Sequence, residues 1–78
     1  MYIDNRPDSK FSIGQEFYSN DTGIVYRIVN VEHHQGYTHY YKTIHSYSYY
    51  LVSHCGAALD LYEYELIEEI QHMKLDEV

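Results

Sequence analysis

The side chains best suited to chemistry in this chain are its six histidines and its single cysteine. Zinc needs three or four nitrogen or sulfur ligands that converge in a tetrahedron, and the spacings between these residues match no known zinc motif. Histidines that only form hydrogen bonds or face solvent are the ordinary alternative. We therefore expect no metal and no other cofactor, and keep a metal- or ligand-binding accessory domain as an alternative. Five of the histidines accompany a tyrosine-rich stretch: His33, His34, His39, His45 and His54.

Cys55 would need a base to act as a nucleophile, and the nearest histidine in sequence is His54. Adjacent residues of a strand point to opposite faces, so His54 is badly placed to take the thiol proton. Paired carboxylates are also present, but no pocket-forming sequence accompanies them. We expect Cys55 to be a small, half-buried turn residue, and the protein not to be an enzyme.

Acidic residues are concentrated towards the C-terminal end. The formal net charge is −7, and the segment 59–78 carries seven acids against one lysine. An acidic chain repels phosphate, so we expect no direct nucleic-acid binding. A protein with a basic surface, such as one whose own ligand is nucleic acid, is the partner that such a charge suits. The alternative is a solvated acidic face that keeps a small domain soluble.

Eleven tyrosines are the other unusual feature, and six of them lie between residues 37 and 52. A chain of 78 residues forms one domain with a thin core, which cannot bury eleven phenol rings. We expect at least four tyrosines on the surface, where they form rigid, amphipathic contacts with a protein. The alternative use, stacking on unpaired bases, is opposed by the charge. The predicted partner-binding residues are Tyr41, Tyr50, Tyr64, Glu63, Glu65 and Glu68.

The residue pattern up to residue 54 predicts antiparallel strands. Residues 1–10 are expected to be a loose lead-in and residues 19–23 a turn. Residues 24–33 are rich in β-branched side chains, and their imperfect alternation predicts a bulge near Val29 and Asn30. Turns at residues 35–36, 45–46 and 55–56 would then separate strands 38–44 and 47–54.

Residues 57–73 fit two interpretations. As a helix, they would begin at Asp60 as N-cap, with Glu63 at the third helical position. As β structure, residues 58–61 and 66–70 would be strands joined by one helical turn. Local propensity favours the helix, and the tail 74–78 should fray.

Several short motifs together suggest a family. They are Phe11-Ser-Ile-Gly14-Gln-Glu-Phe17, Ile24-Val-Tyr-Arg-Ile-Val-Asn-Val31, Tyr49-Tyr-Leu-Val52 and Leu61-Tyr-Glu-Tyr-Glu-Leu66-Ile-Glu-Glu-Ile70. In this order they resemble small SH3-like barrel proteins of bacteriophages and Gram-positive bacteria. The resemblance implies a mainly β fold, a small antiparallel barrel in a single domain. An antiparallel sheet with a C-terminal helix at about 60–73 is the alternative.

Barrels of this kind are mostly non-enzymatic binding modules, and many tiny acidic phage proteins inhibit host enzymes or defence systems, as anti-CRISPR proteins do. The resemblance implies a binding module, and the analogy of size and charge with those phage proteins suggests an inhibitor that binds and blocks a host protein that handles nucleic acid or acts in defence. A structural or assembly module that forms homo-oligomers is the alternative, and an open strand edge predicts a homodimer. The sequence has no apolar signal segment and no run of roughly 20 apolar residues, so we expect no membrane contact and a place in the cytoplasm of a bacterial host cell.

Overall fold

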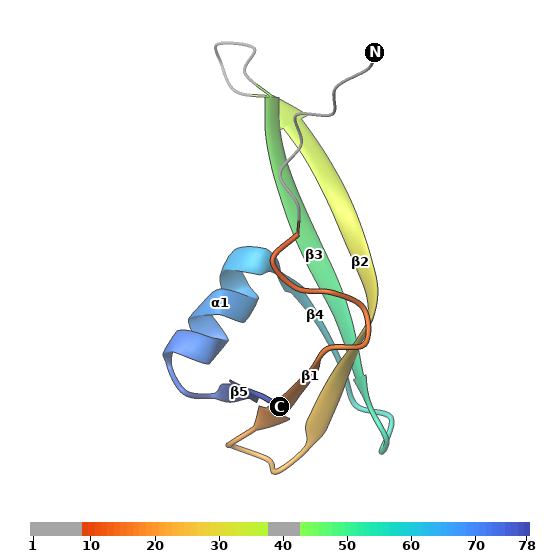
Figure 1. The fold of residues 1–78 in the computed structure, drawn as a ribbon, viewed down its shortest axis with the longest axis vertical. Helices are drawn as coiled ribbons and strands as arrows, with labels where there is room; N and C mark the ends of the chain where they lie inside the picture. The colour runs from red at the N-terminus through yellow and green to blue at the C-terminus, as the bar shows by residue number, and fades with distance from the viewer. Residues whose placement is uncertain (1–8, 38–42) are drawn as a thin grey trace.

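A computed structural model describes residues 9–37 and 43–78. Within this part of the chain, five strands pair antiparallel in one sheet of order β4-β3-β2-β1-β5, which confirms the mainly β prediction (Figure 1). A single helix follows β4. The elements are β1 Glu16–Ser19, β2 Val25–Tyr37, β3 Thr43–Ser53, β4 Ala58–Tyr62, α1 Glu63–Gln71 and β5 Leu75–Glu77.

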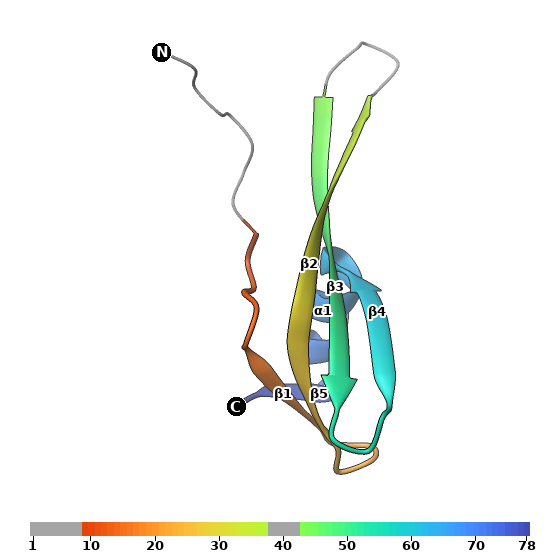
Figure 2. The ribbon, with the colours of Figure 1, turned by 90° about the vertical axis from the view of Figure 1, so that its right-hand side faces the viewer.

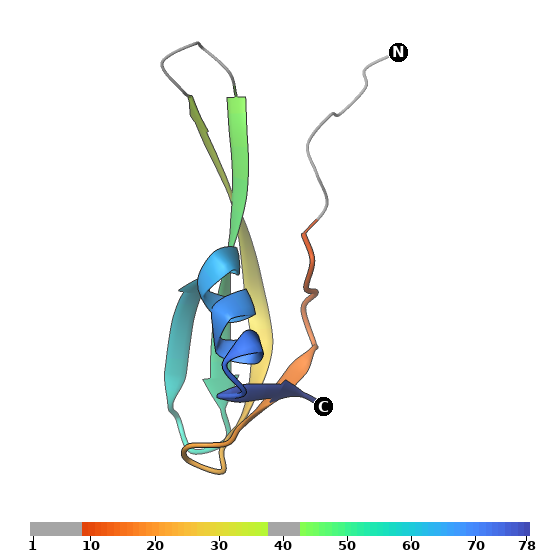
Figure 3. The ribbon, with the colours of Figure 1, turned by 90° about the vertical axis from the view of Figure 1, so that its left-hand side faces the viewer.

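The sheet is open, with β4 and β5 as its two edges. Helix α1 connects these edge strands and lies against one face of the sheet, as Figures 2 and 3 show from opposite sides. The pairing therefore corresponds to the antiparallel sheet with a C-terminal helix. A closed barrel would require hydrogen bonds between the two edge strands, β4 and β5. Here α1 connects these strands instead.

The long strand β2 contains the bulge that the sequence predicts. The pairing of β2 with β3 shifts between Ile28 and Asn30. This shift lets Ile28 and Val31 both face the core, although they are three positions apart, and leaves Val29 exposed. Below the bulge β2 lies between β1 and β3. Above it β2 pairs only with β3, and the two strands continue as a ribbon beyond α1 (Figure 1).

Two predicted turns are wrong, because they lie inside this ribbon. Gln35 is paired with His45, and Gly36 with Ile44. Neither Gln35-Gly36 nor His45-Ser46 is a strong turn sequence, and each pair gains continuous cross-strand hydrogen bonds by staying extended. The link between β2 and β3 falls at residues 38–42, which lie outside the described residues. The turns at 19–23 and 55–56 are confirmed, and Gly56 takes the left-handed φ of 88° that a glycine tolerates.

The core is a small cluster in which aromatic rings predominate. The ring of Phe11 meets Phe17 and Tyr49 edge-on, with centroids 5.6 and 5.4 Å apart. Leu66 is the one residue of α1 that is fully buried. The core consists of Phe11, Phe17, Tyr26, Ile28, Tyr49, Leu51, Leu66 and Leu75.

The C-terminal quarter combines both interpretations of residues 57–73. A strand runs to Tyr62, and the helix begins there rather than at Asp60, because the Glu65 carboxylate accepts the Tyr62 backbone N–H at 2.9 Å. Residues 66–70 are helical, as local propensity favours, and the strand of the alternative interpretation is not formed there.

The tail that we expected to fray is instead ordered as β5. Its first residue, Leu75, is buried and pairs with Ser19 of β1. The Asn20 side-chain amide also donates hydrogen bonds to the Met73 carbonyl and to Asp76 Oδ2, at 2.7 and 2.9 Å. One buried leucine and these contacts hold a segment that propensity alone would leave loose.

Tyr49 makes the stability of the protein sensitive to alkaline pH. Burial raises the pKa of its hydroxyl above the ordinary value of 10.0, with a smaller contribution from the charge of Glu63. Above about pH 10 the native state holds a proton that the unfolded chain releases. The contribution of Tyr49 to the free energy of unfolding should therefore be fully present below that pH and decrease above it. Urea unfolding at about pH 9 and about pH 11 should show a larger loss for the wild type than for Tyr49→Phe. Equal losses in the two proteins would contradict this assignment.

Candidate functional site

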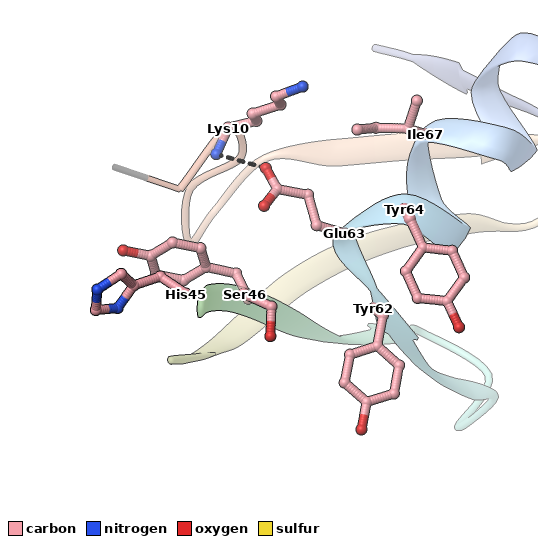
Figure 4. A pocket seen from close by; sticks show the side chains of 8 residues that line it. Lys10, His45, Ser46, Tyr62, Glu63, Tyr64 and Ile67 are labelled. Carbon is pink, nitrogen blue, oxygen red and sulfur yellow. Dashed lines mark hydrogen bonds between the residues drawn. The ribbon is translucent and has the colours of Figure 1, made fainter. Parts of the chain in front are cut away.

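An open groove of about 510 Å³ lies beside β3 at the start of α1 (Figure 4). It exists because β4 pairs with β3 only from Val52 to Ser48, where Tyr62 ends the strand and the chain turns into the helix. Strand β3 extends further, to Thr43, so the groove occupies the place that a longer β4 would fill. Its lining residues are Lys10, His45, Ser46, Tyr47, Tyr62, Glu63, Tyr64 and Ile67.

Two exposed tyrosines form one wall of this groove. The rings of Tyr62 and Tyr64 stack with centroids 5.9 Å apart and planes 10° apart, and Figure 4 shows them side by side with their hydroxyls pointing outward. Tyr62 also contacts the ring of His34, at a centroid distance of 5.7 Å. The three rings therefore form a row that leads from the helix onto the sheet.

The carboxylate of Glu63 is fixed at the same place. Its Oε1 accepts the backbone N–H of Lys10 at 3.1 Å, drawn as a dashed line in Figure 4. This bond ties the residues before β1 to the first turn of α1. It engages the carboxylate without neutralising its charge.

The sheet face turned away from the core extends this aromatic wall. Strand register places Asn30, Tyr50 and Asp60 in one row across β2, β3 and β4. It places Glu32, Ser48 and Tyr62 in the next row. We call the exposed members of this surface the aromatic–acidic face: Glu32, Tyr50, Asp60, Tyr62 and Tyr64.

Few carboxylates of this region lie near a positive charge among the described residues. Among the described residues, one carboxylate lies within salt-bridge distance of a cationic group: Glu32 Oε2 is 3.9 Å from His34 Nε2, and that pair is ionic only if His34 is protonated. No such contact is seen for Asp60 or Glu63 in the same part of the chain. The face therefore carries net negative charge beside exposed rings.

The structure brings together only some of the residues predicted for the site. Tyr50 lies on the aromatic–acidic face, and Glu63 and Tyr64 line the groove. Glu65 serves as the helix cap, and Glu68 is exposed on α1 without lining the groove. Tyr41 lies outside the described residues.

Three members of the aromatic–acidic face were missed, Glu32, Asp60 and Tyr62, and so was His34, whose ring contacts Tyr62. The signal that could have found them is the two-residue alternation of β2 and β4, which places Glu32 with His34 and Asp60 with Tyr62 on common faces. That signal is usable only once the register between the strands is known. The expectation of exposed tyrosines is confirmed within the described chain, where Tyr18, Tyr37, Tyr50, Tyr62 and Tyr64 are exposed.

Three histidines of the described ribbon form hydrogen bonds between β2 and β3. His33 Nε2 lies 2.9 Å from His45 Nδ1 with the rings stacked, and His34 Nε2 lies 2.8 Å from Ser48 Oγ. Among the described residues, no three side chains of His, Cys, Asp or Glu are grouped in a way that could hold a metal ion.

Cys55 lies in the turn between β3 and β4 and is exposed, not half-buried as predicted. Its Sγ is 3.1 Å from Ser53 Oγ. This hydrogen bond lowers the pKa of the thiol, and a hydrogen bond to the backbone of Ala57 lowers it further by a smaller amount. His54 is also exposed, and none of the hydrogen bonds found in the described chain joins it to the thiol.

Comparison with known proteins gives no match, whether to a family model, to a curated protein or to a solved structure. The resemblance to SH3-like barrels stays a prediction. In the described part of the chain, no helix has the length and apolar character needed to cross a membrane.

Proposed function

We propose that this protein is a small, non-enzymatic binding module that attaches to a basic protein surface through its aromatic–acidic face. The observation that carries the proposal is the combination on one face of exposed rings, Tyr50, Tyr62 and Tyr64, with carboxylates that have almost no cationic partner in the described chain. Tyrosine offers a large contact area with few rotatable bonds, so its ordering on binding costs little entropy. The carboxylates add attraction to a basic partner and select against an acidic one.

The acidic charge also supports a role as an inhibitor of a protein that handles nucleic acid. A protein that handles nucleic acid presents a basic surface to phosphate, and an acidic face competes for that surface. The protein would then act as a phage-type inhibitor that blocks such a host protein, or a defence protein with a similar surface, in the cytoplasm of a bacterial host. Nucleic acid itself would be repelled.

A matched pair of charge reversals tests this function. Asp60 lies on the aromatic–acidic face, whereas Asp21 lies in the turn between β1 and β2; both are exposed, and replacing either with lysine changes the net charge equally. Wild-type protein is used to capture partners from a bacterial lysate, and each captured protein is purified and titrated at several salt concentrations. We expect Asp60→Lys to weaken the specific complex by about tenfold or more, and added salt to weaken the wild-type complex. Asp21→Lys should have a much smaller effect.

A second pair separates the rings from the charges. Tyr64→Ala removes an exposed ring of the proposed surface, and Tyr18→Ala removes one from β1, on a different part of the sheet. Loss of binding in the first variant alone would support the proposal. A partner that binds both members of each pair equally, or that binds independently of salt, would contradict it.

A further inference from the structure

The sheet has a third open edge besides those of its two end strands, β4 and β5. It is the part of β3 from Thr43 to Ser46, which lies beyond the pairing of β4 with Ser48–Val52. On the side away from β2, no described strand pairs with these four residues. The groove beside His45 and Ser46 provides room there for an incoming strand.

The ribbon that contains this edge has only two described strands. From Val31 to Tyr37, β2 pairs with β3 alone, because β1 reaches only as far as Arg27. Figure 1 shows this ribbon continuing past α1 and β4. A two-stranded ribbon is marginally stable at best in water, whereas three or more strands support one another.

Charge distinguishes this edge from the two end strands. Edge strand β4 has Asp60 at its centre, and edge strand β5 has Asp76 and Glu77 among its three residues. Antiparallel pairing of β4 or β5 with its own copy would bring carboxylates together, which is destabilising. The segment Thr43–Ser46 carries no charged residue, so self-pairing meets no such opposition there.

We propose that two copies of this chain associate through this edge of β3, strand against strand and antiparallel, to form one continuous sheet across a two-fold axis. The two-fold axis follows because antiparallel pairing of a segment with itself is self-complementary. Each copy places its edge in the other's groove, and each two-stranded ribbon becomes part of a four-stranded sheet. The strand contact itself involves the neutral edge Thr43–Ser46, but the groove that receives it is walled by Tyr62 and Tyr64 of the aromatic–acidic face, so a dimer and a basic partner would compete for these two rings.

The dimer should respond to salt in the opposite direction to binding of a basic partner. Each chain carries a formal charge of −7, so two copies repel each other while their contact edge is neutral. Raising the salt from about 0.01 M to about 1 M shortens the Debye length from roughly 30 Å to roughly 3 Å and removes that repulsion. The dimer should therefore become tighter as salt is added.

Sedimentation equilibrium of the full chain over this salt range tests the proposal, with substitutions of both signs at Ile44. This side chain is 51% exposed and faces Gly36 across the ribbon, so its replacement leaves no cavity. Ile44→Lys and Ile44→Asp should each raise the dissociation constant of the dimer by about tenfold or more, because symmetry duplicates the charge at the contact. The control, Ile13→Lys, changes an exposed residue outside the sheet and should leave the dimer as tight or slightly tighter.

Opposite signs at one position separate a local contact from a general charge effect. If total charge alone governed association, Ile44→Lys would strengthen the dimer and only Ile44→Asp would weaken it. A second measurement, amide hydrogen exchange, should show protection at residues 44–46 that increases with protein concentration. A monomeric wild type throughout the salt range, a dimer indifferent to both Ile44 variants, or a dimer that loosens as salt rises would each overturn the proposal.

Discussion

Replacing Phe17 with alanine is expected to leave much of the protein unfolded at room temperature. Phe17 is fully buried in β1, where it pairs with both Tyr26 of β2 and Glu77 of β5 and meets the ring of Phe11 edge-on. Removing a buried phenylalanine costs about 3–5 kcal/mol. By the usual stability per residue, a 78-residue domain has roughly 4–12 kcal/mol in total, and one with so thin a core belongs near the lower end.

Tyr18→Ala is the matched control for this prediction. It removes an aromatic side chain from the next position of the same strand, which points to the opposite face and is exposed. Its cost should stay below about 1 kcal/mol, typical of surface substitutions. Urea unfolding followed by far-UV circular dichroism measures both variants. Similar losses from Phe17→Ala and Tyr18→Ala would show that the core does not lie where the structure places it.

Leu66→Ala should destabilise the protein by about 2–5 kcal/mol and act first on the C-terminal part of the chain. Leu66 is the only fully buried residue of α1, and the helix rests through it on the sheet. Alanine has a higher helix propensity than leucine, so the loss reflects packing rather than helix formation. Glu63 and Tyr64 begin this helix, so partner binding should weaken although neither residue is changed.

Amide hydrogen exchange with urea unfolding separates these effects. Protection should fall in α1 and β5 before it falls in β2 and β3, because β5 follows the helix and pairs only with β1. Leu66→Met keeps the volume and should cost less than about 1.5 kcal/mol. Gln71→Ala changes an exposed position of the same helix and serves as the surface control. Uniform loss of protection across the sheet, with α1 unaffected, would contradict the role given to Leu66.

The strands show which features of the fold local sequence can predict. The β-branched run of β2 and its broken alternation were enough to predict the strand and its bulge, because both follow from which side chains must avoid water. The turns at 35–36 and 45–46 failed because no local residue preference distinguishes a weak turn from a strand that continues. Cross-strand pairing over the whole ribbon decided the outcome, and that is a property of two segments together.

In the C-terminal segment, tertiary contacts override local propensity. Its residues have good helix propensity, yet helix formation starts only after Tyr62, because residues 58–62 complete the sheet beside β3. The tail 74–78 has little propensity of its own and is ordered by Leu75, which reaches the core from the far edge of the sheet.

The residues alone determined a mainly β protein with more tyrosines than its core can bury, because burial capacity and strand preference depend on composition and spacing. They also determined the acidic C-terminal end, on which the proposal of a basic partner is based. Only the tertiary structure decided which rings and carboxylates lie together. It placed Asp60 beside Tyr50 and Tyr62 beside His34 and assigned Glu65 to the helix cap, because these neighbours are set by strand register and by the point where β4 gives way to α1.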